Sequence, residues 1–200
     1  MVVVITPEHA LPQEQKTLLG LLEAGLERLH VRKPAWNAQE TEHYLLKIPV
    51  RFRSRVSVHG HSELATKLGL GWHLKGHQKI PETGFSESLL SKSVHVWEEV
   101  LQNQNQCDYL FLSPVFDSIS KQNYPAAFEA DVLQKQLHRY NGKAKILALG
   151  GINASNAKKA TAMGFDGVAC LGTIWQEETV EKRIAAWKEI YNTVKQAYSA

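Results

Sequence analysis

The chain has 200 residues, of which 44% are apolar and 22% charged, and this composition is typical of one globular domain spanning residues 1–200. Its 23 basic and 20 acidic side chains leave a net charge of only +3, and no stretch concentrates lysine and arginine. We therefore expect no nucleic-acid partner, because such proteins carry a clustered basic surface. No segment approaches the roughly 18 consecutive apolar residues of a membrane span, so we expect no membrane association.

The cysteines and the first residues bear on the compartment. Cys107 and Cys170 lie far apart and match no CxxC or zinc-ribbon spacing. Unpaired, reduced thiols are typical of the cytoplasm. The run from Met1 to Pro7 is too short for the apolar part of a signal peptide, and it lacks the basic segment with which a signal peptide begins. These features predict a cytoplasmic protein.

Short β-branched runs alternate with amphipathic segments along the whole chain. The expected strands are residues 2–6, 28–32, 55–60, 71–75, 92–96, 109–115, 145–152 and 167–174. The expected helices are residues 12–23, 38–46, 62–68, 96–104, 128–139, 154–163 and, after the last strand, 179–197. One crossover, near residues 84–92, is unusually short.

A closed barrel explains this alternation better than an open sheet. An open doubly wound sheet that binds a dinucleotide carries a GxGxxG motif after its first strand, and none follows residues 2–6. Eight strands separated by crossovers instead predict an α/β protein with a single compact (β/α)8 TIM barrel.

Polar side chains stand two residues apart near the ends of four expected strands. Alternate residues of a strand share one face, so the members of each pair point the same way. The pairs are His30 with Arg32, Ser57 with His59, His73 with Lys75, and Ser93 with His95. Because helices cover the outside of a barrel, we interpret these pairs as the lining of a polar mouth, where barrel enzymes carry their reacting groups. A solvated outer strand face is the alternative.

The last strands end in glycines. Gly150, Gly151 and Gly172 follow the seventh and eighth strands, whose loops form the usual phosphate site of this fold. Glycine lets backbone amides approach an anion closely, although glycine also relieves crowding in a tight turn. After the sixth strand, the segment from Ser118 to Lys121 offers hydroxyls and an ammonium group that suit a diphosphate, with an ordinary serine-rich loop as the alternative.

In their order and spacing these motifs resemble the family of thiamine-phosphate synthases and thiazole tautomerases, from Thr6 to Trp175. The matching pieces are His30-Val31-Arg32-Lys33, His61 to Ala65, Gly71-Trp72-His73-Leu74, Ser93-Val94-His95, Asp108 to Lys121, Ala148 to Ile152, and Asp166 to Ala169. The resemblance implies a compact (β/α)8 barrel. It also implies a transferase of thiamine biosynthesis, which joins hydroxymethylpyrimidine diphosphate to thiazole phosphate and releases diphosphate, with Mg²⁺ as cofactor.

The resemblance also implies roles for individual residues. The diphosphate would be held by Arg32, Ser93 and Lys121, with Lys33 beside the position of a further family lysine. The thiazole phosphate would be held by Ser118, Ser120, Gly150, Gly151 and Gly172. To these we add His59 as a catalytic candidate and His30 and His95 as substrate-binding residues, because imidazoles exchange protons near neutral pH.

Two departures from the family concern its chemistry. The family's two magnesium-binding aspartates fall on Gly60 and near Gln78, so the sequence itself predicts no metal ligand. The proton-shuttling histidine of the tautomerases falls on Pro114, which cannot move protons. The alternative to a synthase is therefore a non-catalytic or tautomerase-like paralogue that binds phosphorylated thiamine precursors.

A third hypothesis is a metal-dependent hydrolase. His59 and His61, with His73 or His95, would supply nitrogen ligands of the kind that zinc prefers.

The last expected helix carries an apolar stripe made of Ile184, Trp187, Ile190, Tyr191 and Val194. Such a stripe is buried in the native protein. It either closes the barrel against the first helix or forms the interface of a homodimer.

Overall fold

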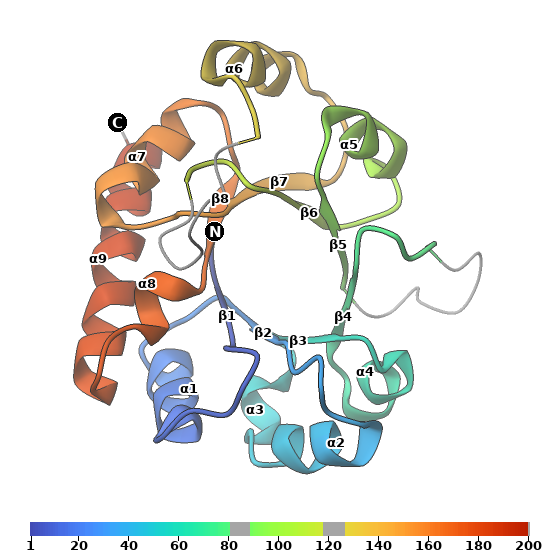
Figure 1. The fold of residues 1–200 in the computed structure, drawn as a ribbon, viewed down its shortest axis with the longest axis vertical. Coiled ribbons are helices and arrows are strands. Elements are labelled where there is room, and N and C mark those ends of the chain that lie inside the picture. Colours follow the sequence, from blue (N-terminus) through green and yellow to red (C-terminus); the bar gives the residue numbers. More distant parts are fainter. Residues whose placement is uncertain (81–88, 118–126, 200) are drawn as a thin grey trace.

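The computed structural model describes residues 1–80, 89–117 and 127–199. Within these residues, eight parallel strands pair in sequence order, and the last pairs with the first to close a barrel. Figure 1 shows this ring of strands enclosed by a ring of helices. The predicted (β/α)8 barrel is confirmed.

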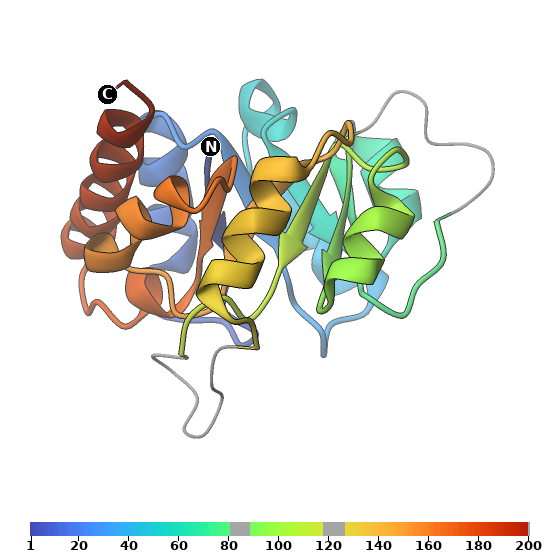
Figure 2. The same ribbon diagram turned by 90° about the horizontal axis from the view of Figure 1, so that it is seen from above.

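The elements follow the expected order. The strands are β1 (Val2–Ile5), β2 (Arg28–Val31), β3 (Val56–His59), β4 (Gly71–Leu74), β5 (Leu90–Val94), β6 (Tyr109–Leu112), β7 (Lys145–Leu149) and β8 (Gly167–Cys170). The helices are α1 (Glu14–Glu23), α2 (Ala38–Leu46), α3 (Val50–Arg53), α4 (Ser62–Leu68), α5 (Trp97–Asn103), α6 (Ala130–Arg139), α7 (Ala154–Ala162), α8 (Gly172–Trp175) and α9 (Val180–Ser199). In Figure 2, which views the barrel from the side, α5 and α6 lie along the outside of the strands.

The eighth strand is shorter than predicted. The expected strand 167–174 ends at Cys170, and the residues after it form α8. The Leu171 carbonyl accepts hydrogen bonds from the amides of Ile174 and Trp175, so this segment satisfies its backbone locally instead of pairing with β1. The Trp175 indole then donates to the Ile5 carbonyl at 2.7 Å, which fixes α8 over the end of β1.

Other strands also differ from the prediction: the sixth and seventh strands end at Leu112 and Leu149, each three residues earlier than expected. The fifth strand begins at Leu90, two residues earlier than expected, and part of the short crossover 84–92 lies outside the described residues. The short helix α3 was not expected, because a single turn carries no helical periodicity.

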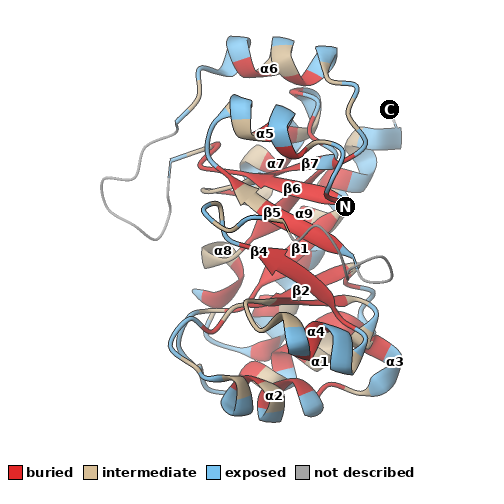
Figure 3. Ribbon diagram, turned by 90° about the vertical axis from the view of Figure 1, so that its right-hand side faces the viewer, coloured by how far each residue is buried: buried red, intermediate tan, exposed pale blue. Residues whose placement is uncertain are grey.

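The core lies between the strands and the helices. Figure 3 shows the strands buried and the outward faces of the helices exposed. Trp187, Ile190 and Val194 of α9 are buried, and α9 packs on α1 and α7. The apolar stripe thus closes the barrel, as one of the two interpretations predicted, while the homodimer stays a prediction. Cys107 and Cys170 are free and buried. Within the described ranges, no helix has the length and apolar character needed to cross a bilayer.

The inside of the barrel has two unlike halves. On the side of β1 and β6–β8 an apolar cluster includes Val3, Ile5, Phe111, Leu147 and Ala169. On the side of β2–β5 the buried inward residues are polar: His30, Ser57, His73 and Ser91. Branched aliphatic residues usually fill a TIM barrel on all sides, so the polar half is a departure that calls for a chemical explanation.

Candidate active site

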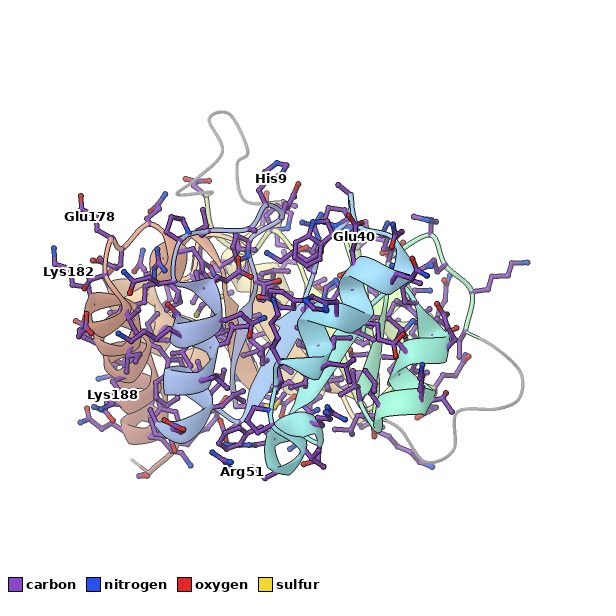
Figure 4. The ribbon with its side chains drawn as sticks, turned by 90° about the horizontal axis from the view of Figure 1, so that it is seen from below. His9, Glu40, Arg51, Glu178, Lys182 and Lys188 are labelled. Carbon is purple, nitrogen blue, oxygen red and sulfur yellow. The ribbon has the colours of Figure 1, made fainter. Side chains whose placement is uncertain are left out.

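A cavity of about 650 Å³ opens at the C-terminal ends of the strands. Its lining includes Ile5, Glu8, Arg32, His59, His73, Lys75, His77, Ser93, His95, Glu99, Phe111, Ser113, Gly150, Gly151, Gly172 and Thr173. This volume is within the range of small-molecule sites. Figure 4 labels His9 and Glu40, which lie at this end of the barrel, and Arg51, which lies at the opposite end.

Seven of the predicted site residues meet in this cavity although they come from separate parts of the chain. They are Arg32, His59, Ser93, His95, Gly150, Gly151 and Gly172. Ser118, Ser120 and Lys121 lie outside the described residues.

Arg32 lies at the rim, just past the end of β2. Its backbone amide donates to the Thr6 hydroxyl at 2.8 Å, which ties the ends of β1 and β2 together. Its guanidinium group lies 2.6 Å from the carboxylate of Glu8, and both side chains remain partly exposed. A cation is therefore held where an anionic ligand would enter.

Lys33 does not line the cavity, contrary to the prediction that it binds substrate. Its ammonium group lies 2.8 Å from the Glu14 carboxylate and donates to the carbonyl oxygens of Pro7 and His9. The Tyr44 hydroxyl also donates to Glu14. Burial lowers the pKa of Lys33, and the contact with Glu14 opposes that shift. Because the ammonium group is buried and fully hydrogen-bonded, Lys33 is a structural residue.

His30 also differs from the prediction, since it lies below the cavity and does not line it. Its side chain is fully buried inside the barrel. Its Nδ1 is 2.9 Å from Nε2 of His59, and its Nε2 is 2.6 Å from the hydroxyl of Tyr109. The Tyr109 hydroxyl lies 3.2 Å from Oγ of Ser57. His30 therefore positions His59, which reaches the cavity.

His73 is held in the same way from the other side. Its Nδ1 is 2.8 Å from Oγ of Ser91, and its Nε2 is 2.9 Å from Oγ of Ser93. Its ring stacks on that of His59, with the centroids 4.1 Å apart. Ser91 and Tyr109 were missed by the sequence analysis. In the sequence, these two residues were marked only by being polar at strand positions that face into the barrel.

Burial keeps these imidazoles neutral. Desolvation lowers the pKa of His30 and His59 well below 6.5, and neighbouring histidines and arginines lower it further. Desolvation and the charge of Arg32 lower the pKa of His73 to about 3. A neutral imidazole has one donor nitrogen and one acceptor nitrogen. The floor of the cavity can therefore exchange hydrogen bonds or ligate a metal ion.

The glycines after β7 have a packing reason. Gly150 and Gly151 have φ values of 98° and 64°, which favour glycine. A Cβ on Gly150 would press on Pro114, and one on Gly151 would overlap the backbone of Asp117. Crowding against the segment after β6 thus accounts for both glycines. Anion binding by these loops remains a proposal.

The two positions at which the sequence resemblance places magnesium-binding aspartates carry no carboxylate. Gly60 has a φ of 69° and no neighbouring atom where a side chain would begin. The Gln78 side chain accepts a hydrogen bond from the amide of Lys75 at 2.7 Å. Neither position offers the carboxylate oxygen that Mg²⁺ prefers.

The carboxylates that line the cavity are engaged elsewhere. Glu8 pairs with Arg32, and Glu99 accepts the amide of His95 at 2.6 Å. In the described part of the chain, the group of side chains close enough to share a metal ion consists of three histidines and contains no carboxylate. The described residues therefore do not fit a resident Mg²⁺.

His61 does not join His59, as the hydrolase hypothesis required. It has a positive φ of 47° before α4. Its Nε2 is 3.3 Å from the carbonyl of Trp36, and its Nδ1 is 3.5 Å from the carboxylate of Glu63. His95 does line the cavity, with Nδ1 3.0 Å from the carbonyl of Ser113. The paired ligands proposed at positions 59 and 61 do not converge.

A family model described as thiamine monophosphate synthase matches residues 2–174. The chain belongs to the thiamine monophosphate synthase family. A thiamine-phosphate synthase from Lysinibacillus sphaericus is 29% identical over 138 residues, which are 66% of this chain and 64% of that protein. One from Streptococcus suis is 33% identical over 95 residues, 47% of this chain and 41% of that protein. The chain thus matches less than two thirds of the length of these relatives.

Two solved structures superpose on nearly the whole chain. A thiamine phosphate pyrophosphorylase from Bacteroides thetaiotaomicron has a TM-score of 0.81 at 26% identity, covering 97% of both chains. One from Pyrococcus furiosus has a TM-score of 0.81 at 22% identity, covering 98% of this chain and 96% of that one. The second, at its lower identity, bears on the fold alone.

Proposed function

We propose that this chain is a thiamine-phosphate synthase-like transferase that binds hydroxymethylpyrimidine diphosphate and thiazole phosphate. One observation carries the proposal: in a member of this family, a cavity at the C-terminal end of the barrel brings together Arg32, Ser93 and the Gly150-Gly151 and Gly172 loops. These are the described residues among those that the family resemblance assigns to the two phosphate groups; Ser118, Ser120 and Lys121 lie outside the described residues.

The reaction would separate charge inside the cavity. The bond between the pyrimidine methylene carbon and the diphosphate oxygen breaks, and the thiazole nitrogen then forms a bond to that carbon. Arg32 and Lys75 line the cavity and would stabilise the departing diphosphate, joined by Lys121. Phe111 and Ile5 form an apolar wall that would keep water from the pyrimidine cation.

His59 would act on the substrate rings. It lines the cavity, is neutral, and is held by its contact with His30. A neutral imidazole adds no positive charge beside a developing cation. It can still exchange a hydrogen bond with a ring nitrogen or an amino group.

Turnover tests the transfer. Purified protein is mixed with both substrates and Mg²⁺, and thiamine phosphate is quantified by chromatography against a reaction without enzyme. We expect the wild-type protein to form thiamine phosphate, and the Arg32→Ala variant to form it at least tenfold more slowly. The control is Arg51→Ala, which changes an exposed arginine at the other end of the barrel and is expected to leave the rate unchanged. No product above the control would refute the transferase and leave the binding claim standing.

A binding paralogue, which was the alternative from the sequence, is the second candidate. It is favoured by the missing carboxylates at Gly60 and Gln78 together with the neutral His59 and His73 at the cavity floor. Calorimetry with thiazole phosphate and with thiamine phosphate separates the two functions. Tight binding without turnover would support the paralogue, and no binding of either compound would refute both.

A further inference from the structure

Three histidines from neighbouring strands converge where the cavity meets the buried barrel interior. His30, His59 and His73 each place one ring nitrogen within 4.8 Å of the other two. The ring centroids of His30 lie 5.1 Å from His59 and 5.0 Å from His73. His59 and His73 line the cavity, and His30 closes the group from below. The group therefore has an open side facing the cavity.

The two buried rings are held by partners on the side away from His59. Nε2 of His30 is 2.6 Å from the Tyr109 hydroxyl, and Nδ1 of His73 is 2.8 Å from Oγ of Ser91. Nδ1 of His30 faces Nε2 of His59 at 2.9 Å, and a metal ion at Nε2 of His73 would replace the hydrogen bond between that atom and Oγ of Ser93, which is 2.9 Å away. Metal-binding histidines are usually oriented in this manner, by a hydrogen bond from the ring nitrogen that does not bind the metal.

The protonation state suits metal binding. A metal ion needs an imidazole with a free lone pair, and protons compete for the same atom. Burial disfavours the imidazolium form of all three rings, so little competition remains at neutral pH. Three neutral nitrogen donors without a carboxylate favour Zn²⁺ or Co²⁺ over Mg²⁺.

The spacing is within reach of a tetrahedral site. Zinc–nitrogen bonds of 2.0–2.1 Å place ligand nitrogens about 3.4 Å apart. Nδ1 of His30 and Nε2 of His59 are 2.9 Å apart, so this pair would open by about half an ångström. The candidate nitrogens all lie within 4.8 Å of one another, and the stacked rings of His59 and His73 would have to tilt for their lone pairs to meet at one ion. The fourth position would face the cavity.

We propose that His30, His59 and His73 bind one zinc-like transition-metal ion, with its fourth coordination position open to the cavity. The site is distinct from the magnesium positions of the family, which fall on Gly60 and near Gln78. It uses the polar half of the barrel interior, which the proposed transferase reaction leaves largely unexplained. The proposal does not rest on that reaction.

Metal binding can be measured without any substrate. Protein without a histidine tag is stripped with a chelator at pH 7.5, titrated with ZnCl₂ by calorimetry, and titrated separately with CoCl₂ in the visible range. We expect one ion per chain and the intense visible absorption of four-coordinate Co²⁺. Absence of saturable binding, or a Co²⁺ spectrum of the weak octahedral type, would overturn the proposal.

Variants locate the ion. His59→Asn and His73→Gln are each expected to weaken Zn²⁺ binding at least 100-fold, and the matched control His61→Asn is expected to leave it unchanged. Ser91→Ala removes only the outer partner of His73 and keeps all three ligands, so a loss of about 10-fold is expected even if a ligand variant fails to fold. Zn²⁺ affinity that survives His59→Asn in a folded protein, or falls with His61→Asn, would refute the assignment.

Discussion

The buried ion pair between Lys33 and Glu14 gives a sharp test of the electrostatics at the barrel mouth. The two side chains are 0% and 3% exposed, and the charged atoms lie 2.8 Å apart. Glu14→Gln removes the negative charge with almost no change in shape and leaves the ammonium group buried. Removing one partner of a buried pair costs about 3–5 kcal/mol, because the remaining charge is uncompensated.

This loss is large beside the stability of an ordinary domain, which is about 5–15 kcal/mol. Chemical denaturation in urea, followed by circular dichroism at pH 7, measures it. With a slope of about 2–3 kcal/mol per molar urea, the midpoint is expected to fall by about 1–2 M. The matched control is Glu42→Gln: Glu42 also forms a close ion pair, 2.6 Å from Lys67, but the lysine side chain is 62% exposed. Its loss is expected to cost less than about 1 kcal/mol.

The stability of the Glu14→Gln protein is expected to depend on pH in a definite direction. In the Glu14→Gln protein the pKa of Lys33 falls further below 10.5, since burial still lowers it and the opposing contact with Glu14 is lost. The unfolded chain then binds more protons than the folded protein between the two pKa values, so stability rises with pH in that window. The deficit relative to wild type is expected to shrink from pH 7 to pH 10. Equal losses for Glu14→Gln and Glu42→Gln, or a deficit that grows with pH, would refute the reasoning.

Three further predictions concern the cavity. Arg32→Ala is expected to weaken pyrophosphate binding by roughly 10- to 100-fold in calorimetry, as for a lost charge-assisted hydrogen bond, whereas Arg51→Ala leaves it unchanged. Gly151→Ala is expected to lower the melting temperature more than Gly60→Ala, because both positions have positive φ but only the first lacks space for a Cβ. The third prediction concerns metal-free protein, in which the pKa of His73 is about 3 in the folded state and near 6.5 in the unfolded chain. Lowering the pH from 8 to 5 is therefore expected to reduce the free energy of unfolding by about 2 kcal/mol through His73 alone. His73→Gln is expected to remove this contribution to the pH dependence.

Each of these predictions has an outcome that contradicts it. Equal pyrophosphate affinity in the two arginine variants would exclude Arg32 from the site. Equal melting temperatures of the two glycine variants would show that the loop after β7 tolerates a side chain. For His73, the sign follows from the buried ring staying neutral while the unfolded ring takes up a proton as pH falls. A stability loss on acidification that is the same in wild type and His73→Gln would refute that explanation.

The proposed function and the proposed metal site meet in one cavity and share His59. The family features, namely Arg32, Ser93 and the glycine loops, concern anionic groups at the rim and on the wall. The histidines occupy the floor, and the group of described side chains there that lie close enough to share a metal ion contains no carboxylate. If the proposed histidine site binds metal, the metal chemistry of this chain differs from the Mg²⁺ chemistry that the sequence resemblance implies.

The amino-acid sequence by itself determined the barrel and the location of the site. Strand and helix periodicities are local properties, and parallel strands joined by crossovers place their C-terminal ends at one face. Polar residues at those ends, such as Arg32, His59 and Ser93, could therefore be assigned to a common mouth before any contact was known. Their presence in one cavity confirms that placement.

Only the tertiary structure decided what each polar side chain does, because partners across the barrel are distant in sequence. Lys33 was expected beside the ligand but pairs with Glu14 of α1. His30 was expected in the cavity but lies beneath His59 and against Tyr109, which is 79 residues away. Alternation tells which face of a strand a residue occupies, whereas depth along the barrel axis depends on the register of all its strands. That register converts a row of polar strand positions into a group of histidines spaced for a metal ion.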